Sequence, residues 1–302
     1  MKLLVIGHSV EDHIHYKDRD VQKDSFGEIK PGGIFYSAAS LVNYKNEEDE
    51  IYLCTQLEKS KEGLFSSVYD KLNKEYIQYV DTIPKVHLMI KDEGEREECY
   101  GSINKNLTLS LNEIEKFDGI LINMITGFDL SLEQLVSIRQ NYNGPVYLDV
   151  HTFSRGLAND MKRDFRVIPD FNKWAENVDI IQVNKYELKT LSLKQKDEDI
   201  IEEVLNFSVR YLIVTLEKEG AKLYTSEKNN LLVSHEPAIK VNVKNKIGCG
   251  DVFGSVFFYN YIKLKDVNKA LKLANIAAGC AASFSELSEY KSLRSDVLSR
   301  YN

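Results

Sequence analysis

Short apolar runs recur along the chain at intervals that fit buried strands. They lie at residues 3–7, 51–54, 120–123, 146–150, 180–183 and 212–216. Between several of them the apolar residues follow helical spacing, as at Leu64, Val68 and Leu72 and again at Leu132, Leu135 and Val136. Strands that alternate with such helices are typical of right-handed β-α-β crossovers. The pattern predicts an α/β fold with a doubly wound, mainly parallel sheet, in which ligands gather at the carboxyl ends of the strands.

Two polar stretches interrupt this alternation, at about residues 13–30 and 85–109. They are charged and partly β-branched or aromatic, with Gly27 and Gly94 as turn formers. Because loops of this length are uncommon without structure of their own, we expect a small β-rich lid that excludes water, with plain surface loops as the alternative. From residue 266 onward a helix with a face of small residues is expected. The prediction is a single domain over residues 1–302.

Composition narrows the class of protein. The 302 residues are 43% hydrophobic, and the formal net charge is −7 with dispersed lysines, which argues against a nucleic-acid partner. The four cysteines, at positions 54, 99, 249 and 280, lack the paired spacing of a zinc or disulfide framework. The first apolar run is too short for a signal peptide or a membrane span. We therefore expect a cytoplasmic protein with no nucleic-acid or membrane partner.

The most informative local motif is a glycine turn at residues 245–251, Asn-Lys-Ile-Gly-Cys-Gly-Asp, which runs into an apolar helix. The start of a helix carries unpaired N–H groups and the positive end of the helix dipole, so it can hold a phosphoryl group. Asp251 beside such a pocket is suited to take a proton from an attacking hydroxyl, which indicates a kinase. An ordinary helix N-cap explains the local pattern equally well.

Companion segments decide between these interpretations. Residues 7–12 follow the first predicted strand, Pro31-Gly32-Gly33 precedes an apolar helix start, and the segment 184–187 follows the strand at 180–183. Together with the turn, they resemble the ribokinase-like (PfkB) carbohydrate kinase family over nearly the whole chain. Residues 148–155 are similar to a segment of its inositol-type kinases and of less characterised members.

The resemblance implies roles for individual residues. Asp251 takes the place of the catalytic base, and the N–H groups of Gly248, Cys249 and Gly250 that of the anion hole. Substrate contacts are implied for Asp12, Gly32, Gly33, Ser37 and Arg96. For Asp12 the alternative is a loop Asx-turn, and for Arg96 a solvated charge.

The resemblance also implies a metal and a nucleotide. Asn184 and Glu187 match a pair that holds Mg²⁺ through water, although an asparagine N-cap with glutamate three residues on is the alternative. ATP contacts are implied for Asn184, Thr215, Glu217, Gly220, Lys246 and Asn275. Members of the family often pair through their lids, so a homodimer is expected.

Two positions depart from the family pattern. The turn begins Asn245-Lys246 where the family usually has Asp-Thr, and this makes the binding of a monovalent cation beside the anion hole doubtful. Either the Lys246 ammonium supplies the positive charge in its place, or the side chain points into solvent. Glu217 stands where the nucleotide loop commonly has glycine, and its carboxylate would repel a triphosphate unless it turns away.

From these residues we predict ATP- and Mg²⁺-dependent phosphorylation of a hydroxyl on a small sugar, polyol or nucleoside-like substrate. The alternative is a catalytically degenerate ligand-binding or sensor protein that retains the kinase fold. A dinucleotide-dependent oxidoreductase is excluded, because no glycine-rich fingerprint follows the first strand.

Overall fold

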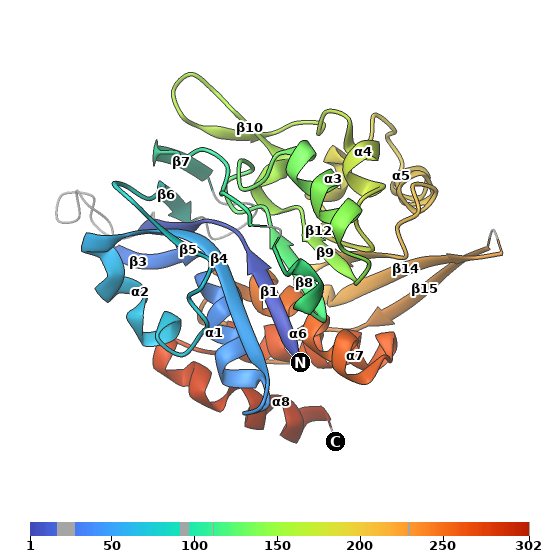
Figure 1. Cartoon of the computed structure of the whole chain (residues 1–302). Coiled ribbons are helices and arrows are strands. Elements are labelled where there is room, and N and C mark those ends of the chain that lie inside the picture. Colours follow the sequence, from blue (N-terminus) through green and yellow to red (C-terminus); the bar gives the residue numbers. More distant parts are fainter. Residues whose placement is uncertain (17–27, 91–96, 111, 229, 302) are drawn as a thin grey trace.

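A nine-stranded sheet forms the centre of the molecule (Figure 1). The computed structural model describes residues 1–16, 28–90, 97–110, 112–228 and 230–301. The strand order is β15-β14-β13-β12-β9-β8-β1-β4-β5. The seven strands β13, β12, β9, β8, β1, β4 and β5 each pair in parallel with their neighbours in this order. Strands β14 and β15 pair antiparallel and form one edge of the sheet. The bounds are β1 Lys2–Ile6, β4 Glu50–Glu58, β5 Ile77–Val80, β8 Gly119–Asn123, β9 Val146–Asp149, β12 Ile180–Asn184, β13 Tyr211–Thr215, β14 Ala221–Glu227 and β15 Asn230–Glu236.

The six apolar runs of the sequence all lie in this sheet, so the predicted doubly wound, mainly parallel α/β fold is confirmed. They read as continuous apolar runs because helices cover both faces of the sheet. One hydrophobic core lies under α1 (Phe35–Tyr44), α2 (Glu62–Tyr69), α6 (Cys249–Leu264), α7 (Val267–Ala282) and α8 (Leu293–Tyr301). The other lies under α3 (Leu132–Asn141), α4 (Phe171–Ala175) and α5 (Asp197–Leu205), and Figure 1 shows the two groups on opposite sides of the strands.

Local signals fix several helix starts. Ser131 caps α3 through a reciprocal capping box with Gln134, and the Asp266 side chain accepts a hydrogen bond from the backbone N–H of Lys269 at the start of α7. The expected small-residue face of α7 is largely buried and packs closely on α6. The predicted helix around Leu72 is shorter than expected, because α2 ends at Tyr69.

A second, four-stranded sheet, here called the small sheet, lies beside the carboxyl ends of the central strands. Its order is β3-β2-β6-β7, with β2 Ser9–Tyr16, β3 Glu28–Gly33, β6 Lys85–Ile90 and β7 Glu97–Ser102. The described residues of the two polar stretches thus lie mainly in strands, although β2 begins before residue 13 and residues 103–109 form no strand. Gly27, Gly94 and Arg96 lie outside the described residues.

The remaining elements are short. Strands β10 (Arg155–Leu157) and β11 (Arg163–Phe165) pair in an antiparallel two-stranded ribbon.

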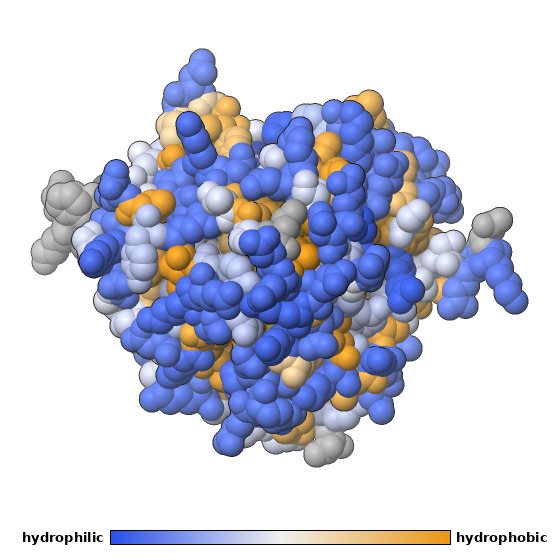
Figure 2. Space-filling view, viewed as in Figure 1, coloured by the Kyte–Doolittle hydropathy of each residue, from blue (hydrophilic) through white to orange (hydrophobic). Residues whose placement is uncertain are grey.

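Figure 2 shows a mainly hydrophilic face on which apolar residues form small separate groups. Within the described parts of the chain, no helix is both long and apolar enough to cross a membrane.

Candidate active site

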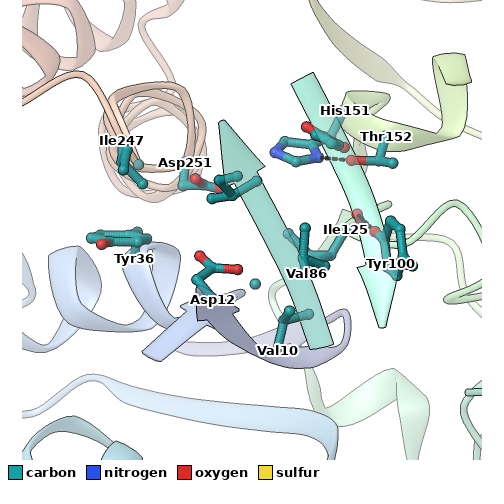
Figure 3. A pocket seen from close by; sticks show the side chains of 14 residues that line it. Val10, Asp12, Tyr36, Val86, Tyr100, Ile125, His151, Thr152, Ile247 and Asp251 are labelled. Atoms are coloured by element: carbon teal, nitrogen blue, oxygen red, sulfur yellow. Dashed lines mark hydrogen bonds between the residues drawn. The ribbon is translucent and has the colours of Figure 1, made fainter. Parts of the chain in front are cut away.

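A pocket lies between the small sheet and the start of α6. It holds about 450 Å³ of empty space, part of it open to solvent. Its polar lining comes from Asp12, Tyr36, Glu98, Tyr100, His151, Thr152 and Asp251. Figure 3 shows the Asp12 and Asp251 side chains directed toward the same space from β2 and α6. The structure therefore brings together two predicted site residues that are far apart in the sequence.

The predicted glycine turn forms the start of α6. Gly248 has φ +78°, and a Cβ atom there would lie 2.3 Å from the Tyr36 ring, so the backbone fits only with glycine. Asp251 follows in the first turn of the helix and is 8% exposed. The Asn245 Oδ1 atom accepts a hydrogen bond from the Ile247 N–H (2.9 Å), which closes an Asx-turn. The unusual asparagine therefore shapes the turn that precedes the helix.

Asn123 holds the carboxylate of Asp251 in place, a role that the sequence analysis missed. It ends strand β8, is 1% exposed, and its amide Nδ2 donates to Asp251 Oδ1 at 2.6 Å. The same Nδ2 lies 3.4 Å from the Ser37 hydroxyl, which places Ser37 one contact away from the proposed base. The Asn123 Oδ1 atom has no hydrogen-bond partner among the described residues. The sequence did contain one signal for this role, because Asn123 is a polar residue at the carboxyl end of a predicted central strand, where ligands bind in such folds.

Asp12 and the two glycines of β3 form one wall of the pocket. Asp12 lies within strand β2, paired with Lys30 and Val86, so the alternative of a loop Asx-turn is wrong. A Cβ atom on Gly32 would lie 2.1 Å from Asp12 Oδ2, and one on Gly33 would lie 2.1 Å from the His8 carbonyl. The glycines therefore make room for the carboxylate and for the tight entry into α1.

His151 and Thr152 complete the opposite wall. They begin a short 3₁₀ turn (His151–Ser154) after β9, and the His151 Nδ1 atom lies 2.7 Å from the Thr152 hydroxyl (Figure 3). His151 has φ +41°, an uncommon conformation for a residue other than glycine, which often marks a functional site. The sequence contained both residues in a family-like segment but offered no physical reason to select them.

The predicted metal pair has the geometry of a capping box. Asn184 Oδ1 accepts from the Glu187 N–H (2.9 Å), and Glu187 Oε2 accepts from the Asn184 N–H (2.8 Å). Within the described parts of the chain, no three His, Cys, Asp or Glu side chains are arranged to hold a metal ion directly. Burial, and then the charges of Glu187 and Asp251, raise the pKa of the Asp149 carboxyl well above its usual value. Crowded carboxylates of this kind fit a divalent cation that is held through water.

Gln182 connects this cluster to the start of α6. Its Nε2 atom donates to Asp149 Oδ2 (3.2 Å) and to the Gly250 carbonyl (3.1 Å), while its Oε1 accepts from the Tyr147 hydroxyl (2.5 Å). A Cβ atom on Gly254 would lie 2.9 Å from Gln182 Oε1, so the helix packs directly on this side chain. The network fixes the first turn of α6 relative to the sheet.

The predicted nucleotide residues lie outside the pocket. Thr215 is the register partner of Asn184 at adjacent strand ends, and Gly220 follows with φ +92°. Glu217 has φ +52° and pairs with Lys185 (3.2 Å), so its carboxylate turns onto a lysine. Asn275, in α7, donates from its Nδ2 atom to the Pro237 carbonyl (2.7 Å).

Lys246 and Cys249 belong to the turn itself. Lys246 is exposed and forms no hydrogen bond or ion pair with the described residues. Burial, followed by the charge of Asp251, raises the pKa of the Cys249 thiol to about 12, so at neutral pH it stays protonated. This agrees with a backbone role for Cys249 in the anion hole.

Known proteins resemble the chain in one family model and in fold. Residues 149–289 match the model of the pfkB family carbohydrate kinase. No curated protein sequence is significantly similar to the chain.

The fold is shared with many solved structures, including three kinases. Burkholderia thailandensis nucleoside kinase in complex with inosine is 18% identical, with a TM-score of 0.76 over 100% of this chain and 97% of that one. Arabidopsis thaliana ribokinase complexed with ribose and ATP is 16% identical, with a TM-score of 0.69 and 98% of both chains covered. A pyrophosphate-dependent kinase in the ribokinase family, complexed with a pyrophosphate analog and myo-inositol, is 15% identical, with a TM-score of 0.73 over 97% of this chain and 100% of that one.

The family match at residues 149–289 supports a phosphotransferase of the carbohydrate kinase class, and the solved structures show that the fold is shared. The match at residues 149–289 agrees with the family resemblance of the sequence motifs, and nearly the whole chain shares the fold of ribokinase-family structures.

Proposed function

We propose that the protein transfers the γ-phosphoryl group of ATP to a hydroxyl of a small sugar, polyol or nucleoside-like acceptor. The observation that carries this proposal is the convergence of Asp251 and Asp12 on one pocket at the start of α6. Ribose, inosine and myo-inositol are bound in the complexes of the three structural neighbours, and ATP accompanies ribose in one of them.

In this proposal each residue has one task. The Asp251 carboxylate takes the proton from the acceptor hydroxyl, and the Asn123 amide holds that carboxylate toward the pocket. The N–H groups at residues 248–250 stabilise charge on the transferring phosphoryl group, because the helix start aims its unpaired donors there. Asp12 accepts hydrogen bonds from other hydroxyls of the acceptor.

A divalent cation and a lid complete the proposal. Asn184 and Glu187, next to Asp149, would hold Mg²⁺ through water, which would neutralise charge on the phosphates. The small sheet acts as a lid that keeps water from competing as acceptor, and Arg96 is assigned as a further substrate contact. Thr215, Glu217, Gly220, Lys246 and Asn275 are assigned to the nucleotide, and two copies pair through their small sheets.

An ATP-consumption screen tests the proposal. The purified protein is assayed with Mg²⁺ and ribose, myo-inositol or inosine, with and without potassium. We expect turnover of at least one acceptor, independent of potassium, and a loss of about 10²- to 10⁴-fold in kcat for Asp251→Asn. Undiminished turnover in that variant contradicts the assignment of the base. Binding without ATP consumption across the panel favours the alternative of a catalytically degenerate sensor.

A further inference from the structure

His8 is a fully buried histidine at the junction between the central sheet and the small sheet, where β1 has ended and β2 has not yet begun. The chain passes between these two parts of the molecule four times, at residues 7–8, at residue 34, at residues 81–84 and from residue 103 onward. The way in which these passages are held determines how the small sheet lies over the pocket.

His8 takes part in three of the four passages. It belongs to the first one itself, and its backbone carbonyl accepts a hydrogen bond from the Ile34 N–H (3.1 Å) in the second. Its ring Nε2 atom lies 3.1 Å from the carbonyl of Lys105, which belongs to the passage that leaves β7. A single side chain therefore connects the way into the small sheet with the way out of it.

Both ring nitrogens of His8 face hydrogen-bond acceptors. The Nδ1 atom lies 2.9 Å from Asp129 Oδ1, and the Nε2 atom faces the Lys105 carbonyl. Burial raises the pKa of the Asp129 carboxyl, but the charge of His8 and hydrogen bonds from His8 and Thr126 outweigh it, and the pKa is lower than usual. Asp129 is therefore a carboxylate that can only accept. A histidine donates from both nitrogens only as the imidazolium, so the ring bridges two acceptors in that form.

The carboxylate end of this bridge is fixed to the central part of the molecule. Asp129 lies in the loop after β8 and is 0% exposed. Its Oδ1 atom also accepts from the backbone N–H of His8 (2.8 Å), and its Oδ2 atom accepts from the N–H groups of Thr126 (2.9 Å) and Gly127 (3.1 Å). The Lys105 end is the part of the bridge that holds the passage from β7 against this fixed point.

The two walls of the pocket lie on opposite sides of the junction. Asp12 and Glu98 belong to strands of the small sheet, whereas Asp251 and His151 belong to the central part. The spacing of these walls therefore depends on the passages. An acceptor that contacts both walls binds tightly only where that spacing is correct.

We infer that His8 is a positioning residue, which sets the small sheet over the pocket by bridging Asp129 and the Lys105 carbonyl. This inference rests on the proposed function and adds to it a residue that does not line the pocket. Loss of the bridge to Lys105 weakens binding of the acceptor, whereas proton transfer to Asp251 changes little once the acceptor is bound.

The test compares two variants that each keep one half of the bridge. In His8→Gln the amide nitrogen takes the place of Nε2 and donates to the Lys105 carbonyl, whereas in His8→Asn the shorter side chain reaches only Asp129. The probe is whichever of ribose, myo-inositol or inosine is turned over. We expect KM for this probe to rise about tenfold in His8→Asn and to stay within about threefold of the wild type in His8→Gln, with kcat within about twofold in both.

A second variant loosens the same passage without changing a fully buried residue. Asn104 is half-buried, and its Nδ2 atom donates to Gln56 Oε1 (2.8 Å) and to the Thr82 carbonyl (2.7 Å). Asn104→Ala should raise KM about threefold to tenfold, and its effect should be less than additive with that of His8→Asn. The control is Asn141→Ala, which removes an amide bond to the Ser137 carbonyl (2.8 Å) in α3 and should leave KM unchanged.

Hydrogen exchange separates this inference from the proposed function, because it requires no turnover. We expect faster exchange of the β2, β6 and β7 amides in His8→Asn than in His8→Gln, with unchanged exchange in β8 and β9. That result supports the inference even where no probe is phosphorylated. Equal exchange in the two histidine variants, or equal KM values where turnover is detected, overturns it. If the histidine variants do not fold, unchanged exchange in the small sheet of Asn104→Ala overturns it, and faster exchange there supports it.

Discussion

The hydrogen bond from Asn123 to Asp251 makes a sharp prediction about catalysis. Asn123→Leu keeps the size of the side chain and removes the donor that lies 2.6 Å from Asp251 Oδ1. A hydrogen bond to a charged group contributes about 1.5–3 kcal/mol, which corresponds to a loss of about 10- to 100-fold in kcat if it acts in the transition state. KM for the acceptor should change little, because Asn123 does not line the pocket.

Stability should respond differently from activity. The Asn123 Oδ1 atom is buried and has no partner among the described residues, so leucine also removes a polar atom whose burial is uncompensated there. We therefore expect a change of no more than about 1 kcal/mol in the free energy of unfolding, measured in urea. A kcat within twofold of the wild type would refute the positioning role, and a fall in kcat that parallels a large loss of stability would indicate general damage.

The matched variant Asn123→Asp changes charge instead of size. It places a second carboxylate beside Asp251, and two like charges this close favour protonation of one of them. The acid limb of the profile of kcat/KM against pH should move to higher pH, whereas Asn123→Leu should lower the rate without such a shift.

Two further predictions concern stability. Gln182→Leu removes the hydrogen-bond partner that the Tyr147 hydroxyl and the Asp149 carboxyl share, and it should lower the free energy of unfolding in urea by about 2 kcal/mol. Tyr147→Phe keeps the contact of Gln182 with Gly250 and should lower it by about 1 kcal/mol. Equal costs of the two variants would contradict the bridging role of Gln182. For Asp49, burial raises the pKa, but hydrogen bonds from Tyr259 and the N-terminal amine outweigh it and lower the pKa from 3.8 to about 2. The carboxylate should therefore stabilise the fold above about pH 4 and lose that contribution as the pH falls toward 2, so the stability difference between wild type and Asp49→Asn should shrink over this range.

The central sheet could be predicted because its strands are buried on both faces. Such strands read as unbroken apolar runs, as at residues 120–123 and 180–183, and their alternation with helical spacing fixes the fold class. The small sheet was predicted only as a β-rich region. Its strands alternate between a pocket face and an outer face, so His13 and Asp12 have opposite surroundings although they are neighbours in the chain.

The candidate site was predictable only in part. Asp251 stands in a motif that also contains Gly248, and the positive φ of Gly248 shows a backbone geometry that favours glycine. Asn123, Glu98 and His151 reach the site from separate elements, and their proximity depends on strand order and register, which local sequence does not encode. Asn184 and Glu187 illustrate the opposite problem, because a capping box and a metal pair use the same residues at the same spacing.

The first residue of the glycine turn connects backbone geometry with electrostatics. An aspartate at position 245 could accept the same hydrogen bond from the Ile247 N–H, but it would add a negative charge beside the proposed phosphate site. Asparagine keeps the Asx-turn and removes that charge, which reduces the need for a monovalent counterion at this place. Burial and the charges of Glu187 and Asp251 raise the pKa of the Asp149 carboxyl, and a divalent cation held through water near these carboxylates would relieve their repulsion. Charge compensation should therefore depend on Mg²⁺ and not on potassium, with Lys246 free to approach the phosphates from solvent.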